Sequence, residues 1–244
     1  MTTLATRRPT AVLIAGPTAS GKSALALDLA DRLDGVVVNA DSMQIYAGLR
    51  LLTARPSVEE EARAPHRLYG HVAPERPYSV ADWLADVGPV LDEIAAAGRT
   101  AIVVGGTGLY FEALVGGLAP VPEIPDAVRA HWRAVAEREG AAGLAAELAA
   151  RDPEMAARLR PTDTQRMTRA LEVIAATGRS LALWQAEPHS APLVDRAAAV
   201  AIVLEPVRAL LHARIERRFH QMVDRKSTRL NSSHTDISRM PSSA

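Results

Sequence analysis

The segment Gly16–Ser23 restricts the fold of this chain more than any other, because it matches the pattern Gly-x-x-x-x-Gly-Lys-Ser/Thr at every fixed position. That pattern requires a strand directly before it and a helix directly after it. Residues 11–15 form an apolar run with β-branched members, which is typical of a buried parallel strand. Leucines four residues apart predict a helix over residues 23–33. The sequence therefore predicts a phosphate-binding loop, or P-loop, in its required context.

A P-loop binds phosphate through its backbone. N–H groups of the loop and the positive end of the following helix surround the phosphate oxygens. Lys22 adds a mobile positive charge, and the hydroxyl of Ser23 can bind Mg²⁺. We therefore expect a di- or triphosphate ligand and Mg²⁺ as the cofactor. The predicted phosphate-binding residues are Gly16, Pro17, Thr18, Ala19, Ser20, Gly21, Lys22 and Ser23.

Strand and helix patterns alternate after the loop. Residues 36–38 and 100–104 are short apolar runs that predict two further buried strands. Residues 79–97 lie between them and predict a helix, with Ser79 as its N-cap. This alternation favours an α/β fold in which helices flank a parallel sheet. With the P-loop, it predicts a P-loop NTPase-like core.

The character of the sequence changes at the prolines near position 120. Alanine- and arginine-rich helical patterns follow, and a strand pattern returns at 199–204. The last twenty residues lose alanine and gain serine, which predicts a foreign segment joined to a truncated gene, with a disordered tail as the alternative. The expected segments are a P-loop core over 10–121, a helical insertion over 122–190, the return to an incomplete core over 191–224 and a non-native or disordered tail over 225–244.

Composition narrows the function classes. Lys and Arg number 28, as do Asp and Glu, so the net charge of zero argues against unselective coating of nucleic acid. The chain has no cysteine, which excludes disulfides and cysteine–zinc sites and suits a reducing compartment. No apolar run approaches the roughly 18 residues of a membrane-spanning helix. We expect a cytoplasmic monomer that does not enter membranes.

Polar residues follow two of the predicted strands. Asp41 comes just after strand 36–38, and Thr107 lies in the glycine-rich turn that ends strand 100–104. Ligands of open α/β sheets bind at the carboxyl ends of the strands. Asp41 can hold Mg²⁺ through water or accept a proton there, although it can also simply cap a turn. Because strand 100–104 ends in glycine, Asp41 is the acidic residue predicted at this edge.

A basic helical pattern lies in the predicted insertion. Arg166 and Arg169 are three residues apart, so they share one face of a helix. That face can meet a phosphate backbone, although a solvated helix surface has the same pattern.

Several short segments follow one another in a recognisable order: Gly16–Ser23, Asn39–Tyr46, Thr53–Pro56, Ala64–Leu68, Val104–Tyr110, Asp152-Pro153, Pro161–Asp163, Gln165–Val173 and Leu211–Met222. This ordered set resembles the bacterial tRNA dimethylallyltransferases over about residues 10–224. The sequence departs from that pattern at Arg55, where lysine is common, and from Arg225 onward.

The resemblance implies a reaction and a set of roles. A dimethylallyl group would pass from its diphosphate to N6 of the adenosine on the 3′ side of the anticodon in tRNA. The P-loop and Arg218 would hold the donor diphosphate, with Lys22, Asp41 and Thr107 as the catalytic residues and Asp41 as the proton acceptor. The implied tRNA-binding residues are Asp41, Ser42, Met43, Gln44, Thr107, Arg129, Gln165, Arg166, Met167, Thr168 and Arg169.

Two other functions stay open from the residues alone. One is a small-molecule kinase or another P-loop phosphotransferase, which would bind ATP and use a hydroxyl acceptor. The other is a nucleotide-binding module without transfer chemistry, which would not depend on Asp41.

Overall fold

The computed structural model describes residues 9–223, so the predicted foreign or disordered tail, 225–244, lies outside the described residues. The chain forms two compact units. One unit combines the residues up to Val115 with those from Pro192 onward, and the other comprises Gly116–Ala191. The division therefore lies six residues before the predicted start of the insertion at 122 and one residue after its predicted end at 190.

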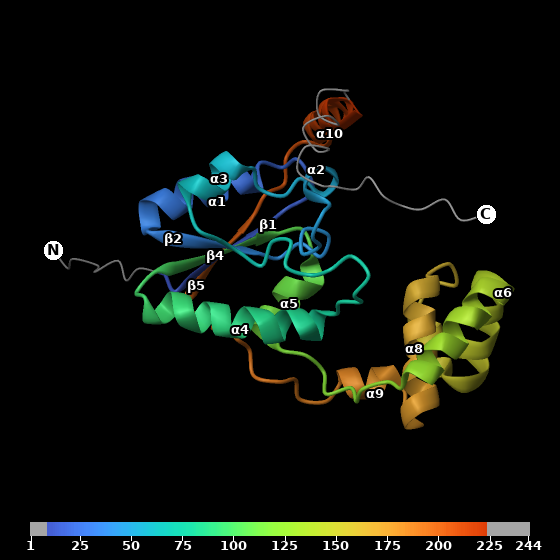
Figure 1. The fold of residues 1–244 in the computed structure, drawn as a ribbon. Coiled ribbons are helices and arrows are strands. Elements are labelled where there is room, and N and C mark those ends of the chain that lie inside the picture. The colour runs from blue at the N-terminus through green and yellow to red at the C-terminus, as the bar shows by residue number, and fades with distance from the viewer. Residues whose placement is uncertain (1–8, 224–244) are drawn as a thin grey trace, which may run out of the picture. The chain divides into compact units, whose positions relative to one another are not determined.

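The first unit is built on a parallel sheet, which confirms the predicted fold class (Figure 1). The strand order is β3-β2-β4-β1-β5, and every pairing is parallel. Ala15 of β1 pairs with Gly105 of β4, and Asn39 of β2 pairs with Val104, so three strands end at nearly the same level. The strands are β1 (Ala11–Ala15), β2 (Gly35–Asn39), β3 (His66–Arg67), β4 (Thr100–Gly105) and β5 (Ala199–Val203).

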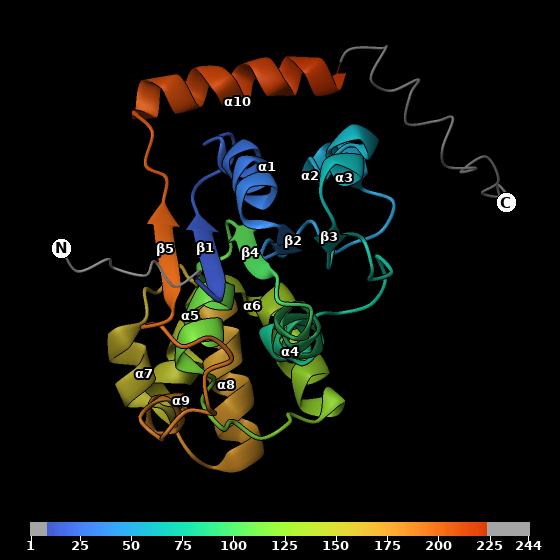
Figure 2. The ribbon, with the colours of Figure 1, turned by 90° about the vertical axis from the view of Figure 1, so that its left-hand side faces the viewer.

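Helices cover both faces of this sheet. Figure 2 shows α1 on one face and α4 and α5 on the other. Successive strand residues point to opposite faces, so Ile14 packs with the α1 residues Ala26 and Leu27, whereas Val38 packs with Trp83 of α4. The helices of this unit are α1 (Lys22–Leu33), α2 (Arg50–Thr53), α3 (Val58–Arg63), α4 (Val80–Ala96), α5 (Gly108–Gly116, which ends in the other unit) and α10 (Arg208–Val223).

The two long helices of the sheet begin in different ways. The Ser79 side chain accepts the Asp82 N–H, and the Asp82 carboxylate accepts the Ser79 N–H, so α4 begins with a capping box. At α1 the N-cap is Gly21, whose φ of 95° lies in the left-handed region that glycine adopts readily. No described side chain caps α1, so the N–H groups of its first turn are available to a ligand.

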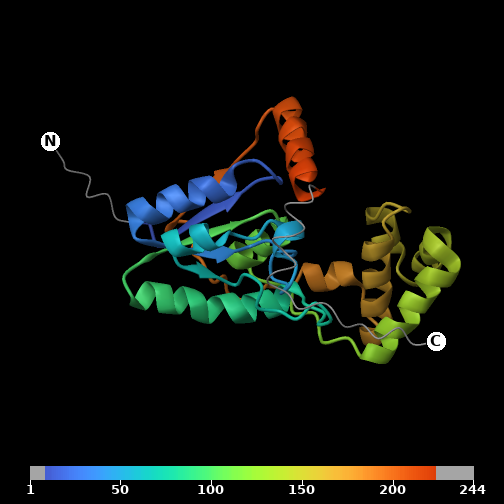
Figure 3. The same ribbon diagram turned by 45° about the horizontal axis from the view of Figure 1, so that its top comes forward.

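The second unit consists of helices around a separate core. In α6 (Asp126–Arg151), Gly140 has a φ of 65°, and the helix breaks there into two arms. α6 lies beside α8, and the two pack extensively (Figures 1 and 3). The remaining helices are α7 (Pro153–Arg158), α8 (Thr164–Thr177) and α9 (Leu181–Gln185). Within residues 9–223, no helix is both long and apolar enough to span a membrane.

Candidate active site at the carboxyl edge of the sheet

The P-loop connects β1 to α1 in a compact turn. The Ser20 N–H donates to the Pro17 carbonyl at 3.2 Å, and the Lys22 ammonium donates to the same oxygen at 3.1 Å. The Ser20 hydroxyl is buried and has no hydrogen-bond partner among the residues that the structure describes. This orphaned hydroxyl and the uncapped start of α1 leave several donors free for an anionic ligand.

Asp41 begins the turn that follows β2. Its Oδ1 accepts the Met43 N–H at 3.0 Å, and its backbone carbonyl accepts the Gln44 N–H at 3.1 Å. Asp41 Oδ2 has no hydrogen-bond partner within residues 9–223, and it lies 3.6 Å from where a Cβ on Gly106 would stand. One carboxylate oxygen therefore shapes the turn, whereas the other is free to act on a ligand.

The turn after β4 comes very close to the turn after β2. A Cβ on Gly105 would lie 2.0 Å from the Ala40 carbonyl oxygen, so only glycine fits this position. The Thr107 N–H donates to that carbonyl at 3.2 Å, and the Thr107 hydroxyl accepts the Ser42 N–H at 2.9 Å. Thr107 thus ties the two turns together.

The P-loop and the Asp41 turn border a pocket of about 340 Å³. Its lining consists of Thr18–Ser23 of the P-loop and Ala24, together with Asp41, Gln44, Thr53, Ala54, Arg214 and Arg218. The turn after β2 supplies Asp41, α1 supplies Lys22, and α10 supplies the two arginines. Three cationic side chains therefore surround one free carboxylate oxygen, which suits a polyanionic ligand.

Burial lowers the pKa of two of these cationic side chains, Lys22 and Arg218. Burial lowers the pKa of Lys22, Asp41 opposes that shift, and the positive charge of Arg218 adds to it. The pKa of Arg218 is likewise lowered by burial and supported by Asp41. A bound diphosphate would favour the charged forms of both side chains, because it brings negative charge to the same place.

The residues around the pocket fit Mg²⁺. Ser23 contributes a hydroxyl at the exposed start of α1, and Asp41 contributes a free carboxylate oxygen in the same pocket. Both are hard oxygen ligands, and Mg²⁺ is typically held by one or two protein oxygens together with phosphate oxygens and water. Within the described part of the chain, no group of three or more His, Cys, Asp or Glu side chains gathers to bind a metal.

Not every predicted residue borders the pocket. Gly16, Pro17 and Thr107 are not part of its lining. The Pro17 carbonyl accepts the Lys22 ammonium, and the Thr107 hydroxyl accepts the Ser42 N–H. Met43 is exposed, whereas the side-chain amide of Gln44 donates to the carbonyls of Thr53 and Ala54. The four backbone N–H groups of the Asp41–Gln44 turn are already hydrogen-bonded within the protein, so the turn offers Met43 and the free oxygen of Asp41 to a ligand.

The predicted RNA-contacting residues of the helical unit differ in exposure. Gln165 and Arg166 are exposed on α8, and Arg169 is half-buried beside Glu172. Arg129 donates to the Ile124 carbonyl at 3.1 Å. Thr168 is half-buried. Met167 requires a correction, because its side chain is only 1 % exposed and lies in the hydrophobic core of the unit.

Sequence reasoning missed Ala24, Thr53, Ala54 and Arg214 of the pocket lining, and it missed Asn39 beside the Asp41 turn. Arg214 borders the pocket beside Arg218, and the four-residue spacing on one helix was the available signal. Asn39 is fully buried and contacts the Asp41 turn. Its signal was a lone polar residue at the end of an otherwise apolar strand.

Sequence comparison identifies the family. The family described as IPP transferase matches residues 44–228, and the family described as isopentenyl transferase matches residues 9–73. A tRNA dimethylallyltransferase of Azorhizobium caulinodans is 59% identical over 217 residues, which are 89% of this chain and 69% of the relative. One from a Chelativorans species is 57% identical over 213 residues, 87% of this chain and 73% of the relative.

Solved structures similar to this chain come from enzymes of the same kind. A tRNA isopentenylpyrophosphate transferase of Bacillus halodurans superposes with a TM-score of 0.55 at 33% identity, covering 92% of this chain and 69% of that one. A eukaryotic dimethylallyltransferase that acts on tRNA gives a TM-score of 0.71 at 25% identity, covering 90% of this chain and 54% of that one. These similarities extend over both described units. This chain belongs to the IPP transferase family, which includes the tRNA dimethylallyltransferases.

Proposed function

We propose that this chain transfers a dimethylallyl group from dimethylallyl diphosphate to N6 of the adenosine on the 3′ side of the anticodon in tRNA, and that diphosphate is released. The observation that carries the proposal is the pocket in which a carboxylate oxygen of Asp41 without a protein partner faces a P-loop. Relatives that are 56–59% identical over most of the chain carry the name of this activity.

The P-loop binds the leaving group in this reaction. The N–H groups at the start of α1 and the Ser20 hydroxyl donate to diphosphate oxygens, and Lys22, Arg214 and Arg218 supply positive charge. The bond between C1 of the dimethylallyl group and the diphosphate oxygen breaks, and its electron pair leaves with the diphosphate. Donors fixed in place before the reaction stabilise the negative charge that develops on that oxygen.

Asp41 receives the proton. As the N6 amine forms its bond to C1 it must lose one proton, and Asp41 Oδ2 is the free acceptor at the pocket. A general base acts only within hydrogen-bonding reach of that proton. The adenine therefore has to leave its stack in the RNA to enter the pocket.

The oxygen ligands of the pocket at the P-loop fit a bound Mg²⁺. The hydroxyl of Ser23 would hold it, and Asp41 would contact it only through water, so that Asp41 Oδ2 stays available for the N6 proton. When bound, Mg²⁺ neutralises charge on the diphosphate and so makes it a better leaving group.

The tRNA would contact both units. Met43 is exposed and available to the target nucleotide, and Thr107 fixes the Asp41–Gln44 turn. In the helical unit, Gln165, Arg166, Thr168, Arg169 and Arg129 remain the proposed contacts. Because tRNA is the substrate, we propose that the protein acts in the cytoplasm.

Mass spectrometry of an anticodon stem-loop tests the proposal. The chain is incubated with Mg²⁺, dimethylallyl diphosphate and a stem-loop that carries adenosine on the 3′ side of the anticodon. The matched control carries inosine there, which lacks the N6 amine. We expect a dimethylallyl gain on the adenosine RNA alone. Equal gain on both RNAs would contradict attack by N6. If neither RNA gains the group, and a parallel incubation with ATP phosphorylates a small acceptor, the kinase would be favoured.

A further inference from the structure

Asn39 is a buried polar residue at the end of β2, with an exposed fraction of 0%. Its side-chain Nδ2 donates to the Asp41 carbonyl at 3.0 Å and to the Leu68 carbonyl at 3.1 Å. Its Oδ1 accepts the Asp41 N–H at 3.0 Å. Both hydrogens of the amide nitrogen are therefore used, and the orientation of the amide is fixed, since a backbone N–H can only donate.

These bonds hold the backbone of Asp41 on both sides. Asn39 Oδ1 binds the N–H of Asp41, and Asn39 Nδ2 binds its carbonyl. With the backbone fixed, Asp41 Oδ1 accepts the Met43 N–H, and Oδ2 is left at the pocket. The position of the free oxygen therefore depends on the Asn39 amide as well as on the sheet.

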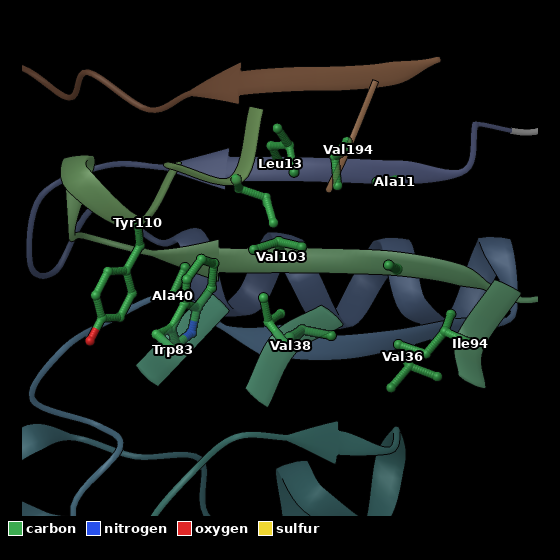
Figure 4. Packing of buried hydrophobic residues seen from close by; sticks show 13 residues of the cluster. Ala11, Leu13, Val36, Val38, Ala40, Trp83, Ile94, Val103, Tyr110 and Val194 are labelled. Carbon is green, nitrogen blue, oxygen red and sulfur yellow. The ribbon is translucent and has the colours of Figure 1, made fainter. Parts of the chain in front are cut away.

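Asn39 is itself anchored in the rigid core. The Trp83 indole N–H donates to the Asn39 carbonyl at 2.9 Å, and Trp83 is fully buried. The Trp83 ring stacks on Tyr110 with centroids 4.4 Å apart, and Figure 4 shows both side chains beside Ala40. Asn39 thus connects the Asp41 turn, which its side chain binds, to α4 and α5, which its backbone carbonyl contacts through Trp83.

We propose that Asn39 is a positioning residue for transfer, whose side-chain amide aims Asp41 Oδ2 at the N6 proton. The inference rests on the proposed function and assigns Asn39 no contact with substrate. An apolar residue of similar size would fill the same volume, but it would leave the Asp41 N–H and two carbonyls without these partners. The turn would then be free to rotate the carboxylate away from the pocket.

A comparison of Asn39→Leu with Thr100→Val tests this role. Thr100 is also fully buried, and its hydroxyl donates to the Pro9 carbonyl at the opposite edge of the sheet. Asn39→Leu loses three side-chain hydrogen bonds and Thr100→Val loses one, so both should be less stable and are assayed well below their unfolding temperatures. For Asn39→Leu we expect kcat to fall by about 10²-fold, because misplacing a catalytic group by about 1 Å has effects of that size. We expect the KM for dimethylallyl diphosphate to change less than about threefold, since the P-loop is untouched.

The separation of kcat from KM is the readout that a purely structural role would not produce. Partial unfolding or a displaced P-loop would weaken donor binding together with turnover, whereas a misdirected Asp41 carboxylate lowers kcat alone.

The outcomes separate this inference from the proposed function. If the wild type and Thr100→Val transfer the group with similar kcat, and the folded Asn39→Leu variant loses kcat but keeps its KM for dimethylallyl diphosphate, the positioning role is supported. If the folded Asn39→Leu variant retains kcat, or if its KM rises together with the loss of kcat, that role is overturned while the proposed function stands. A wild-type chain without transfer overturns the proposed function, and this inference with it.

Discussion

The two sides of the pocket are built differently. On the Asp41 side, the turn is held by hydrogen bonds from Asn39 and Thr107 and is backed by the buried Trp83. On the α10 side, Arg214 and Arg218 border the pocket, but the structure records no hydrogen bond or ion pair for either guanidinium within the described residues. The apolar residues of α10, such as Leu210 and Phe219, are largely exposed.

The difference between the two sides indicates that the Asp41 side accepts the proton and the α10 side binds the diphosphate. A proton acceptor has to be placed within hydrogen-bonding distance of one atom, so a rigid turn suits Asp41. Cations that neutralise a diphosphate act through longer-range attraction, and they can be drawn into place by the ligand itself. Changes on the rigid side should therefore affect kcat, and changes on the α10 side should affect the binding of the donor.

The largest effect is expected for Asp41→Asn. Asparagine keeps the side-chain oxygen that accepts the Met43 N–H, so the turn can persist, but the proton acceptor is lost. We expect kcat to fall by roughly 10²–10⁴-fold, the usual contribution of a general base. Rapid-quench transfer assays measure this, and calorimetry should show donor binding within a few fold of wild type. Asp34→Asn, at the exposed end of α1, is the matched control. If Asp41→Asn loses donor binding as strongly as kcat, Asp41 instead holds a metal ion or the structure of the turn.

A smaller effect, on binding, is expected for Lys22→Met. Methionine keeps the unbranched apolar stem but removes the charge in the P-loop. A hydrogen bond to a charged group contributes about 1.5–3 kcal/mol, so the Kd for dimethylallyl diphosphate should rise by roughly 10- to 100-fold. Calorimetry measures this change against the exposed Arg32→Met. An unchanged Kd would show that the P-loop does not bind dimethylallyl diphosphate.

Arg214→Gln should have a weaker effect of the same kind. Its guanidinium borders the pocket on a helix with exposed apolar residues, and we expect the Kd for the donor to rise by about 3- to 10-fold. Arg217→Gln removes the same charge three residues along α10 at an exposed position that does not border the pocket. Equal effects of the two substitutions would show that α10 acts through its overall charge alone.

The smallest effect is a pH dependence of donor binding. Burial and Arg218 lower the pKa of Lys22 from its usual value of 10.5, and diphosphate binds the protonated ammonium. Affinity should therefore fall as pH rises through the lowered pKa, earlier than for an exposed lysine. Arg218→Gln removes a charge that lowers this pKa, so the fall should move to higher pH, whereas Asp41→Asn should move it to lower pH. Titrations of donor affinity against pH measure both shifts, and shifts of the same sign would contradict the arrangement of these charges.

Much of the core could be predicted because its signals are local. The apolar strand and the glycine-rich motif specify the β1–P-loop–α1 unit, and α1 begins at Lys22, one residue before its predicted start. The proximity of Asp41 to the P-loop follows from parallel strands ending at one level, and the structure shows this through Ala15, Asn39 and Gly105.

Other features escaped prediction because they depend on the tertiary structure. β3 has only two residues, His66 and Arg67, too few for any periodicity. The resemblance implies an RNA contact at Met167, but Met167 and Leu171 are four residues apart on α8 and lie in one buried cluster, as is typical of a buried helix face. The bonds of Asn39 to Leu68 join positions 29 residues apart, and no local pattern predicts such a contact.

The fate of the bridging oxygen of the donor tests the central claim most directly, because it shows which bond breaks. Dimethylallyl diphosphate is prepared with ¹⁸O between C1 and phosphorus, and the products formed with the adenosine stem-loop are weighed by mass spectrometry. If the P-loop holds a leaving diphosphate while N6 attacks carbon, all of the label appears in the released diphosphate. Label in dimethylallyl alcohol or dimethylallyl monophosphate would mean attack at phosphorus, and the chain would then be a phosphotransferase.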